Sequence, residues 1–430
     1  MSAAGGSPVQ ITKLDPSKLE SSHRFPLLLP DGDHYLFVVQ AQRTVLASGS
    51  LKTGRRLADI PGIDSSVGYS QGSLLFVRGA TLLAQAFDPA RLQFSSDPVE
   101  VADKIQADSQ FNFGIFSVSS NGWLVYQAGA TGLSQQLVWI DRTGKQLGSV
   151  PGAGNYAGIS LSPSGKQLLV EVDEVSAGKR AIWLFDLVAG TRSRLTFNDA
   201  SGDPIWSHDG GKLAFDVGQS AELHVRDLAS GVETALFSMP GESIAEGWSP
   251  DNRYVLLGLH GNEANSKWEI WIADTAGQHN RYPLLRASTD AQWARLSPDG
   301  KWLAYVGGET GRPEIYVVPV DFAASQPKAG ANKWQISTDG GLFPVWAHDG
   351  RELFFTNVSQ TTLYAAQFTA AGGMVHAGTA AKLFDLSPHH GGAFFYDVSS
   401  DGKKLYVAEA PQGGSPPLTV VTNWQARIKK

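Results

Sequence analysis

A short turn sequence returns along the whole chain, and this repetition constrains the fold more than any other feature. Typical copies read SPDG (297–300) and SHDG (207–210), and successive copies lie 40 to 52 residues apart. The nine copies occupy residues 30–33, 69–72, 119–122, 162–165, 207–210, 249–252, 297–300, 347–350 and 399–402. A period of about 40–50 residues is typical of β-propeller blades. The repeat therefore predicts a propeller.

The composition of the tetrad explains why it forms a turn. Pro presets the backbone for a type I turn, Ser and Asp side chains bond nearby amides, and Gly or Asn accepts the left-handed conformation. Strand-like runs lie on both sides of each turn, as in PIWS, KLAFDV, ELHVRDL and ETALFSM around SHDG. Four short strands per unit predict a four-stranded antiparallel blade. No stretch of helical length shows a 3.6-residue period, so we predict an all-β chain.

The repeat count predicts one β-propeller domain over residues 1–430, with eight to nine blades. The tetrads give nine, and the irregular second unit allows eight. The last unit offers only three strand-like runs, so we predict that residues 8–15 supply its outer strand and close the ring. The units are expected at about residues 22–62, 63–106, 107–152, 153–198, 199–241, 242–287, 288–339, 340–387 and 388–426.

Composition limits the classes of partner. Acidic residues outnumber basic ones by 41 to 35, and the net charge of −6 offers no basic field for nucleic acid. The chain has no cysteine, which excludes disulfides and thiolate metal ligands. No apolar run approaches the roughly 20 residues that cross a bilayer, and the opening MSAAGGSPVQ lacks a secretory-signal pattern. We expect a monomer that contacts neither nucleic acid nor membrane, and the compartment stays open.

Longer motifs extend the repeat beyond its turn. SPDGKWLAYVGGETGRPEIYVVPV (297–320), QLVWIDRTGKQLGSV (136–150), IWLFDLVAGTRSRLTF (182–197) and SPPLTVVTNWQARIKK (415–430) are the clearest. With them the chain resembles the PD40, WD40-like repeats of TolB-type propellers. It is most similar to the propeller regions that follow the kinase domain and membrane helix of some bacterial serine/threonine protein kinases. No kinase motif occurs in the sequence. The resemblance therefore implies the non-catalytic propeller of a signalling protein, extracytoplasmic if such a helix precedes it.

Three short motifs are typical of chemical sites, and each has a simpler explanation. GYSQG (68–72) matches the nucleophile elbow around Ser70, but a strand and not a helix follows it. PDGDH (30–34) lacks the closing Glu of a calcium loop. His389 and His390 precede the innermost strand of the last unit, yet the ten histidines show no zinc-binding spacing. We predict no metal, no cofactor and no catalytic residue.

Blade topology places a candidate site. The starts of the first strands share one face with the loops between second and third strands, and the tetrads lie on the opposite face. Ligand sites form where loops converge at a channel mouth. We predict that the mouth on the first-strand face is formed by Tyr156, Asp203, Glu246, Gln292, Phe343 and His390. Its predicted rim is formed by Glu174, Glu263, Asn265, Glu309 and Arg312.

The function predicted from these observations is a non-catalytic binding or sensor module. Its loop face would present this acidic, aromatic mouth to a peptide, a protein or a small polar ligand. One alternative is a propeller hydrolase or lyase with its site at the channel mouth, supported by the acids and histidines there. Another is an accessory domain that gates a peptidase, which needs a hydrolase partner. Fold alone does not decide between them.

Overall fold

The computed structural model describes most of the chain, and what it describes is β-structure. The described residues are 9–18, 20, 22–41, 44–108, 113–128, 135–174, 179–198, 201–218, 221–261, 266–324, 326–371, 374–386, 395–409 and 418–427. Their helical segments are two short 3-10 turns, η1 (Pro16–Lys18) and η3 (Trp424–Arg427). Within these ranges no helix is long and apolar enough to span a membrane. The prediction of an all-β chain is confirmed.

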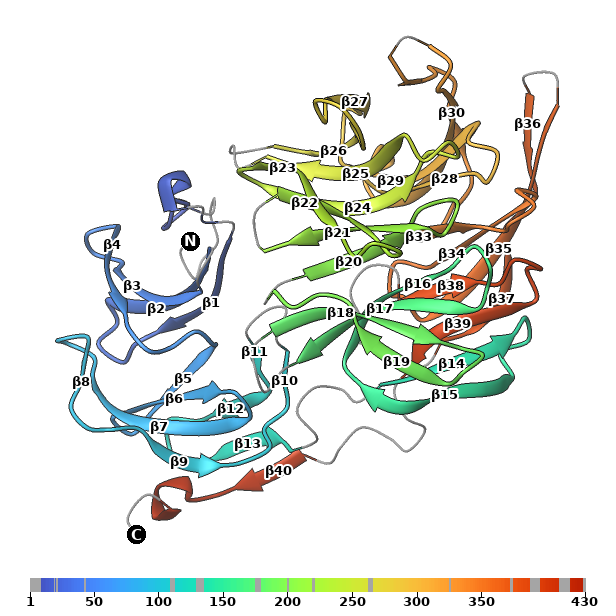
Figure 1. Cartoon of the computed structure of the whole chain (residues 1–430). Coiled ribbons are helices and arrows are strands. Elements are labelled where there is room, and N and C mark those ends of the chain that lie inside the picture. Colours follow the sequence, from blue (N-terminus) through green and yellow to red (C-terminus); the bar gives the residue numbers. More distant parts are fainter. Residues whose placement is uncertain are drawn as a thin grey trace. The chain divides into compact units, whose positions relative to one another are not determined.

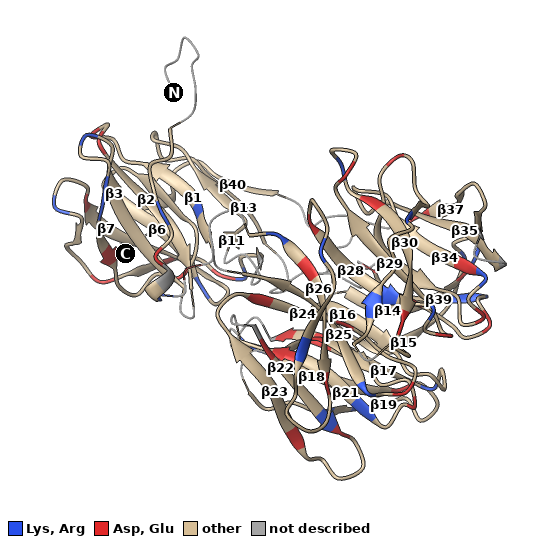
Figure 2. Ribbon diagram, turned by 90° about the horizontal axis from the view of Figure 1, so that it is seen from above, with Lys and Arg blue, Asp and Glu red and all other residues tan. Residues whose placement is uncertain are grey.

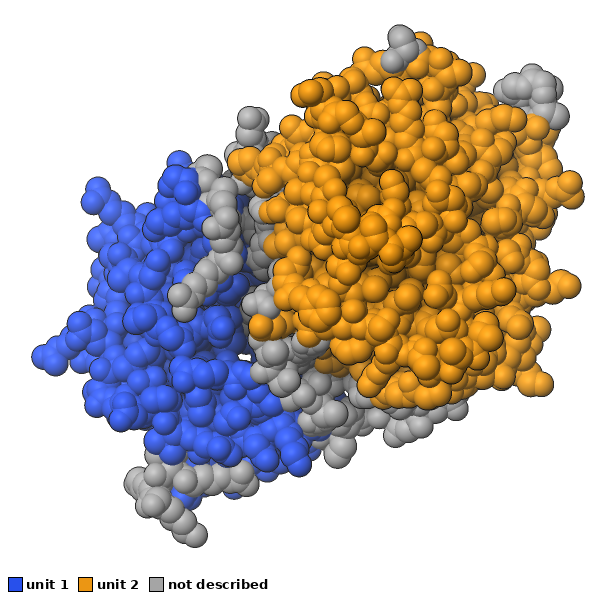
Figure 3. Space-filling view, in the orientation of Figure 1, with its two compact units in different colours: residues 1–133, 175–178, 413–430 blue, residues 134–174, 179–412 orange. Residues whose placement is uncertain are grey.

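The chain divides into two compact units, where the sequence predicted one domain (Figure 3). The first unit contains residues 1–133, 175–178 and 413–430. The second contains residues 134–174 and 179–412. Each unit has its own β-sheets and its own buried clusters. Each is therefore described by itself.

The second unit is built from six antiparallel sheets (Figure 1). Five of them use strands that follow one another along the chain, innermost first. The first sheet contains β16 (Tyr156–Leu161), β17 (Gln167–Glu174), β18 (Lys179–Asp186) and β19 (Thr191–Arg194). The second contains β20 (Ser201–Trp206), β21 (Lys212–Val217), β22 (Ala221–Asp227) and β23 (Glu233–Met239). The third contains β24 (Glu242–Trp248), β25 (Tyr254–His260), β26 (Trp268–Asp274) and β27 (Arg281–Leu285). The next two are β28 (Ala291–Leu296), β29 (Trp302–Gly307), β30 (Glu314–Asp321), β31 (Lys328–Ala329) and β32 (Trp334–Gln335); and β33 (Leu342–Trp346), β34 (Glu352–Thr356), β35 (Thr362–Ala371), β36 (Met374–Ala377) and β37 (Ala381–Asp385).

The sixth sheet closes the ring with strands from both ends of the second unit. Its order is β15-β14-β39-β38, with β14 (Gln135–Asp141), β15 (Gln146–Gly154), β38 (Tyr396–Val398) and β39 (Lys404–Glu409). The register between β14 and β39 runs from Gln136 opposite Glu409 to Asp141 opposite Lys404. Since β39 has β38 on one edge and β14 on the other, no edge remains for the predicted closing segment, residues 8–15. Of that segment, residues 9–15 belong to no strand.

Apolar clusters fill every boundary between neighbouring sheets of this ring. The boundary between the sixth and first sheets contains Leu137, Leu168 and Ala408. Three further clusters fill the next three boundaries, and one large cluster fills the last two, between the fourth and fifth and between the fifth and sixth sheets. Both faces of the central strands are therefore buried, which explains why their sequences do not alternate between apolar and polar residues. Six filled boundaries around six sheets describe a closed six-bladed propeller.

The first unit contains three larger sheets of the same kind. The first is β1 (Ser22–Leu28), β2 (His34–Gln40), β3 (Val45–Ser50) and β4 (Arg55–Ile60). The second is β5 (Val67–Ser70), β6 (Ser73–Arg78), β7 (Thr81–Asp88), β8 (Gln93–Phe94) and β9 (Val99–Ala102). The third joins β12 (Phe116–Val118) and β13 (Leu124–Gln127) to β40 (Leu418–Val421), and β10 (Ala107–Asp108) pairs β11 (Phe113–Gly114) nearby in sequence.

The strands of the predicted unit 107–152 divide between two sheets, which the sequence analysis did not predict. The first two strands of that unit, β12 and β13, pair with β40 from the C-terminal end. Its last two strands, β14 and β15, complete the sixth sheet of the ring. The nine tetrads still fall in nine sheets, each between a first and a second strand. The repeat count was therefore informative, although the nine sheets do not form one ring.

Residues 9–18 have a role of their own in the first unit. The Tyr35 hydroxyl donates a hydrogen bond to the Ile11 carbonyl at 3.3 Å. Arg56 of β4 forms an ion pair with the buried Glu20 at 2.5 Å. These contacts lie beside the buried cluster of Tyr35, Phe37 and Val39 on the first sheet. The N-terminal segment thus packs against the first sheet of its own unit.

Candidate functional site

A cavity of about 230 Å³ lies at one end of the ring's central channel. Each of the six first strands contributes to its wall at the end where the strand enters its tetrad. The polar and aromatic lining residues used below are Ser160, Trp206, His208, Glu246, Trp248, Arg295, Trp346, His348, Tyr396 and Asp397. The cavity is therefore on the tetrad face, opposite the face that the sequence predicted.

The tetrads hold this wall with one repeated hydrogen-bond pattern. The Ser297 hydroxyl donates to Asp299 at 2.6 Å and accepts from the Trp302 amide at 3.0 Å. The same pair of bonds recurs at Ser207, Ser249 and Ser399. Asn252 replaces Gly in one tetrad and keeps its left-handed φ of 58°. The altered tetrad preserves the turn because asparagine tolerates that conformation.

Tryptophans precede three of the tetrads and connect neighbouring sheets. The Trp206 indole N–H donates to the Ser160 carbonyl at 2.9 Å, and that of Trp346 donates to the Arg295 carbonyl at 3.1 Å. Each bond reaches back to the first strand of the preceding sheet. Trp248 occupies the same position, yet its buried indole N–H has no hydrogen-bond partner among the described residues. The wall therefore includes one unused donor.

Buried carboxylates also link neighbouring sheets of the ring. Glu171 accepts from the Asp203 amide at 2.9 Å, and Asp216 accepts from the Ala245 amide at 2.6 Å. Glu246 accepts from the Trp293 amide at 2.5 Å. Each bond joins one sheet to the next. These acids consequently help to align the ring.

Arg295 is the lining residue that brings positive charge among these acids. Its guanidinium donates to the Glu246 carbonyl oxygen, and it interacts electrostatically with Glu246, Asp397 and Asp203. Burial lowers the pKa of Arg295 to about 10, which leaves it charged at neutral pH. Elsewhere on the second unit, acidic and basic residues are interspersed along strands and loops (Figure 2). The cavity differs because two lining carboxyls, Glu246 and Asp397, interact with one lining guanidinium, Arg295.

Desolvation dominates the protonation of these carboxyls. Burial raises the pKa of Glu246 to about 8, although the Ala294 amide and Arg295 oppose the shift. Burial likewise raises the pKa of Asp216 to about 7. The pKa of Asp203 is raised by burial and by Asp216, and the pKa of Asp397 is raised by burial. A carboxyl that leaves water without a full complement of donors favours its neutral form.

Residues 203–412 match the family model for the TolB beta propeller domain, PD40. This part of the chain therefore resembles β-propellers of the TolB type. The uncharacterized protein Atu1656 of Agrobacterium fabrum is 25% identical over 206 residues, which cover 45% of this chain and 67% of that protein. A provisionally assigned TolB from Agrobacterium tumefaciens aligns with a TM-score of 0.49 at 19% identity, over 65% of this chain and 99% of that one. TolB from Acinetobacter baumannii aligns with a TM-score of 0.43 at 14% identity, over 83% and 81%.

The predicted mouth residues take different places in the six-bladed ring. Glu246 lines the cavity, and Asp203 interacts electrostatically with it. Phe343 is buried and packs against Trp293, with ring centroids 4.7 Å apart and the rings tilted by 55°. Gln292 is a half-buried residue of β28. Tyr156 is buried against Phe185. His390 lies outside the described residues. Of the predicted mouth residues, Glu246 thus lines this cavity and Asp203 interacts with Glu246, while the predicted mouth on the first-strand face stays a prediction.

The predicted rim residues form a separate group or cannot be described. Glu263 and Asn265 lie outside the described residues, and Glu174 is described only as part of β17. Glu309 forms an ion pair with Lys333 at 2.6 Å. Neither it nor Arg312 lines the cavity.

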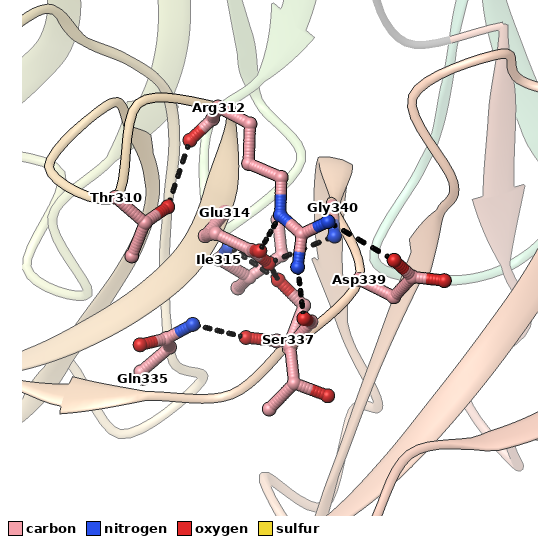
Figure 4. A network of polar contacts seen from close by, with 9 residues as sticks. Thr310, Arg312, Glu314, Ile315, Gln335, Ser337, Asp339 and Gly340 are labelled. Carbon is pink, nitrogen blue, oxygen red and sulfur yellow. Dashed lines mark hydrogen bonds and ion pairs between the residues drawn. The ribbon is translucent and has the colours of Figure 1, made fainter.

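Arg312 belongs to a polar network that joins the fourth sheet to the segment before the fifth (Figure 4). Its guanidinium pairs with the buried Glu314 at 2.8 Å and with Asp339 at 3.1 Å. Glu314 also accepts hydrogen bonds from the Ser337 hydroxyl and from the Gly340 amide. Every charged group of this network has a partner within it. The network is a structural clamp.

The sequence prediction missed the three tryptophans, Arg295 and Asp397. A signal for the tryptophans was present, since IWSHDG, GWSPDN and VWAHDG place Trp directly before the tetrad. Aligning the repeats would have shown that these rings converge at the tetrad end of the channel. Arg295 and Asp397 each occur in one repeat, so no periodic signal marks them.

Proposed function

We propose that the TolB-type propeller of this chain is a non-catalytic binding module. The observation that carries the proposal is the cavity to which all six first strands contribute. It combines indole rings, imidazoles and buried charges in one concave site, and such a combination is typical of ligand pockets. The ligand class is a peptide segment or a small polar molecule that enters from the tetrad face.

The sequence resemblance supports a wider context for this module. The motifs at 136–150 and 182–197 are similar to propellers that accompany bacterial serine/threonine kinases. Under this proposal the module senses a ligand for a larger signalling protein. A rigid, closed ring suits that task because its binding wall is held in place before the ligand arrives.

The proposal can be tested with 5-fluorotryptophan and fluorine NMR. Three signals would be assigned with the variants W206F, W248F and W346F, and the full chain would be titrated with a mixed tripeptide library. We expect shifts in these three signals, while the signals of Trp123 and Trp424 in the first unit stay unchanged. Shifts confined to tryptophans outside the cavity, or to none, would contradict the proposal.

One observation favours a second candidate, an enzyme with a channel acid. Burial raises the pKa of Glu246 to about 8, so this carboxyl holds its proton at neutral pH as a general acid does. Its bond to the Trp293 amide gives it a structural role as well. Product formation from a bound peptide that is lost in E246Q, even at peptide concentrations that saturate the variant, would establish the enzyme.

A further inference from the structure

The floor of the cavity contains more negative than positive groups. Glu246 and Asp397 line the floor, and Asp203 interacts electrostatically with Glu246. Arg295 is the lining residue that interacts with all three of these acids. Arg180 also interacts electrostatically with Asp203, but it is paired with Glu171 and Asp173, so with every group ionised the acids here still outnumber the bases. Buried acids without matching cations are costly, and a bound cation relieves that cost.

Glu246 also has an unused acceptor. Its side chain is fully buried, and Oε1 accepts from the Trp293 amide at 2.5 Å. Its second oxygen, Oε2, is buried without a hydrogen-bond partner among the described residues. An orphaned carboxylate oxygen in a cavity wall requires a donor to satisfy it. The Ala294 amide also interacts with this carboxyl, and a donor from the ligand would give Oε2 a hydrogen bond of its own.

The walls suit the same kind of ligand. Trp206, Trp248 and Trp346 line the cavity, and indole rings attract organic cations through their electron-rich faces. His208 and His348 lie at the tetrad end of the wall. Aromatic walls above an acidic floor would hold an extended, positively charged side chain by its stem and by its head.

We infer that the cavity binds an organic cation, a guanidinium or ammonium group that donates to Glu246 and Asp397 while its stem lies against the tryptophans. This inference rests on the proposed function and specifies its ligand. The cation is carried either by an Arg or Lys side chain of a peptide or by a free small amine. A guanidinium fits best because its planar fork donates several hydrogen bonds to separate carboxylates.

A metal ion fits the floor less well. No group of three or more His, Asp or Glu side chains in the described part of the chain converges closely enough to hold one. A metal needs several ligand atoms at about 2–2.6 Å from one point. An organic cation spreads its donors over a wider area, which matches carboxyls contributed by different sheets.

The test is isothermal titration of the full chain with charge-matched probes. The peptide Ac-Gly-Arg-Gly-NH2 would be compared with its neutral isostere Ac-Gly-citrulline-Gly-NH2 and with Ac-Gly-Glu-Gly-NH2, and agmatine would represent a free amine. We expect the arginine peptide, agmatine or both to bind about tenfold tighter than the citrulline peptide or more. The stronger of these two identifies the source of the cation.

Proton linkage supplies an independent readout. A cation would ionise carboxyls that otherwise keep their protons, so binding should release protons and tighten as pH rises from about 6.5 to 8.5. E246Q should weaken binding about tenfold and reduce the proton release.

A matched variant separates the site from general effects on the fold. E314Q changes another fully buried carboxylate that links sheets but lies outside the cavity, and it should leave binding unchanged. Equal or tighter binding of the citrulline or glutamate peptide would overturn the cation inference while leaving the binding module intact. Absence of binding by all four probes, with no tryptophan signal moved by the library, would overturn both.

Discussion

At the scale of single residues, the buried acids of the second unit link neighbouring sheets although their burial disfavours the charged form. Glu171, Asp216 and Glu246 each accept an amide from the next sheet, which aligns the ring. Burial nevertheless raises the pKa of each of these carboxyls. Each of them therefore keeps its proton to a higher pH in the folded chain than in the unfolded chain, and a ligand that donates to Glu246 would favour the ionised form of that residue.

This predicts how stability depends on pH. In the unfolded chain these carboxyls have pKa values of about 4. Their folded pKa values are raised to between about 7 and about 8, so the folded chain binds more protons over the interval between. The free energy of unfolding should then be highest at the acid end and fall as pH rises from about 5 to 8. Chemical denaturation at several pH values measures this slope.

Variant E246Q tests whether Glu246 causes part of this fall in the free energy of unfolding with pH. One pK unit corresponds to about 1.4 kcal/mol, so removing Glu246 should remove at least about 1 kcal/mol of the fall. D299N is the control, because hydrogen bonds from Ser297 and the Lys301 amide outweigh desolvation and lower the pKa of Asp299. An unchanged slope in E246Q would show that other groups carry the pH dependence.

At the scale of elements, the tryptophans before the tetrads act as links between sheets. We predict that W206F and W346F each lower the free energy of unfolding by about 1 kcal/mol more than W248F does. The physical reason is that Trp206 and Trp346 donate to a carbonyl of the preceding sheet, and Trp248 does not. The net value of such a bond is about 0.5–1.5 kcal/mol. Urea denaturation of the three variants measures it, and equal losses would contradict the role assigned to the bonds.

The elements themselves could be predicted well from local sequence. SPDG and its relatives determine each turn, because their Ser and Asp side chains bond the turn's own backbone. The four strands around SHDG appear in the structure within a few residues of the predicted runs. The cavity face could not be predicted in this way, since Glu246, Arg295 and Asp397 meet only when three separate sheets are assembled.

At the scale of the whole molecule, the pairing of strands from distant parts of the chain could not be predicted from the sequence. β14 pairs with β39, and β13 pairs with β40, across most of the chain's length. Antiparallel edges of similar apolar strands offer no local mark of their partner, and the spacing of the tetrads is the same for one ring or two units. The count of nine sheets was therefore predictable, and their division between a closed ring and a second unit was not.

Closure of the ring between β14 and β39 is the central claim, because the cavity exists only if the sixth sheet completes the wall. Val138 and Val407 are register partners in this pair, and the natural chain has no cysteine. Antiparallel partners lie about 4.5–5.5 Å apart at Cα, within the range for a disulfide. Oxidised V138C/V407C, measured by non-reducing electrophoresis and intact mass, should form one intramolecular disulfide, while I11C/V407C should remain reduced. A disulfide in I11C/V407C with none in V138C/V407C would contradict the account.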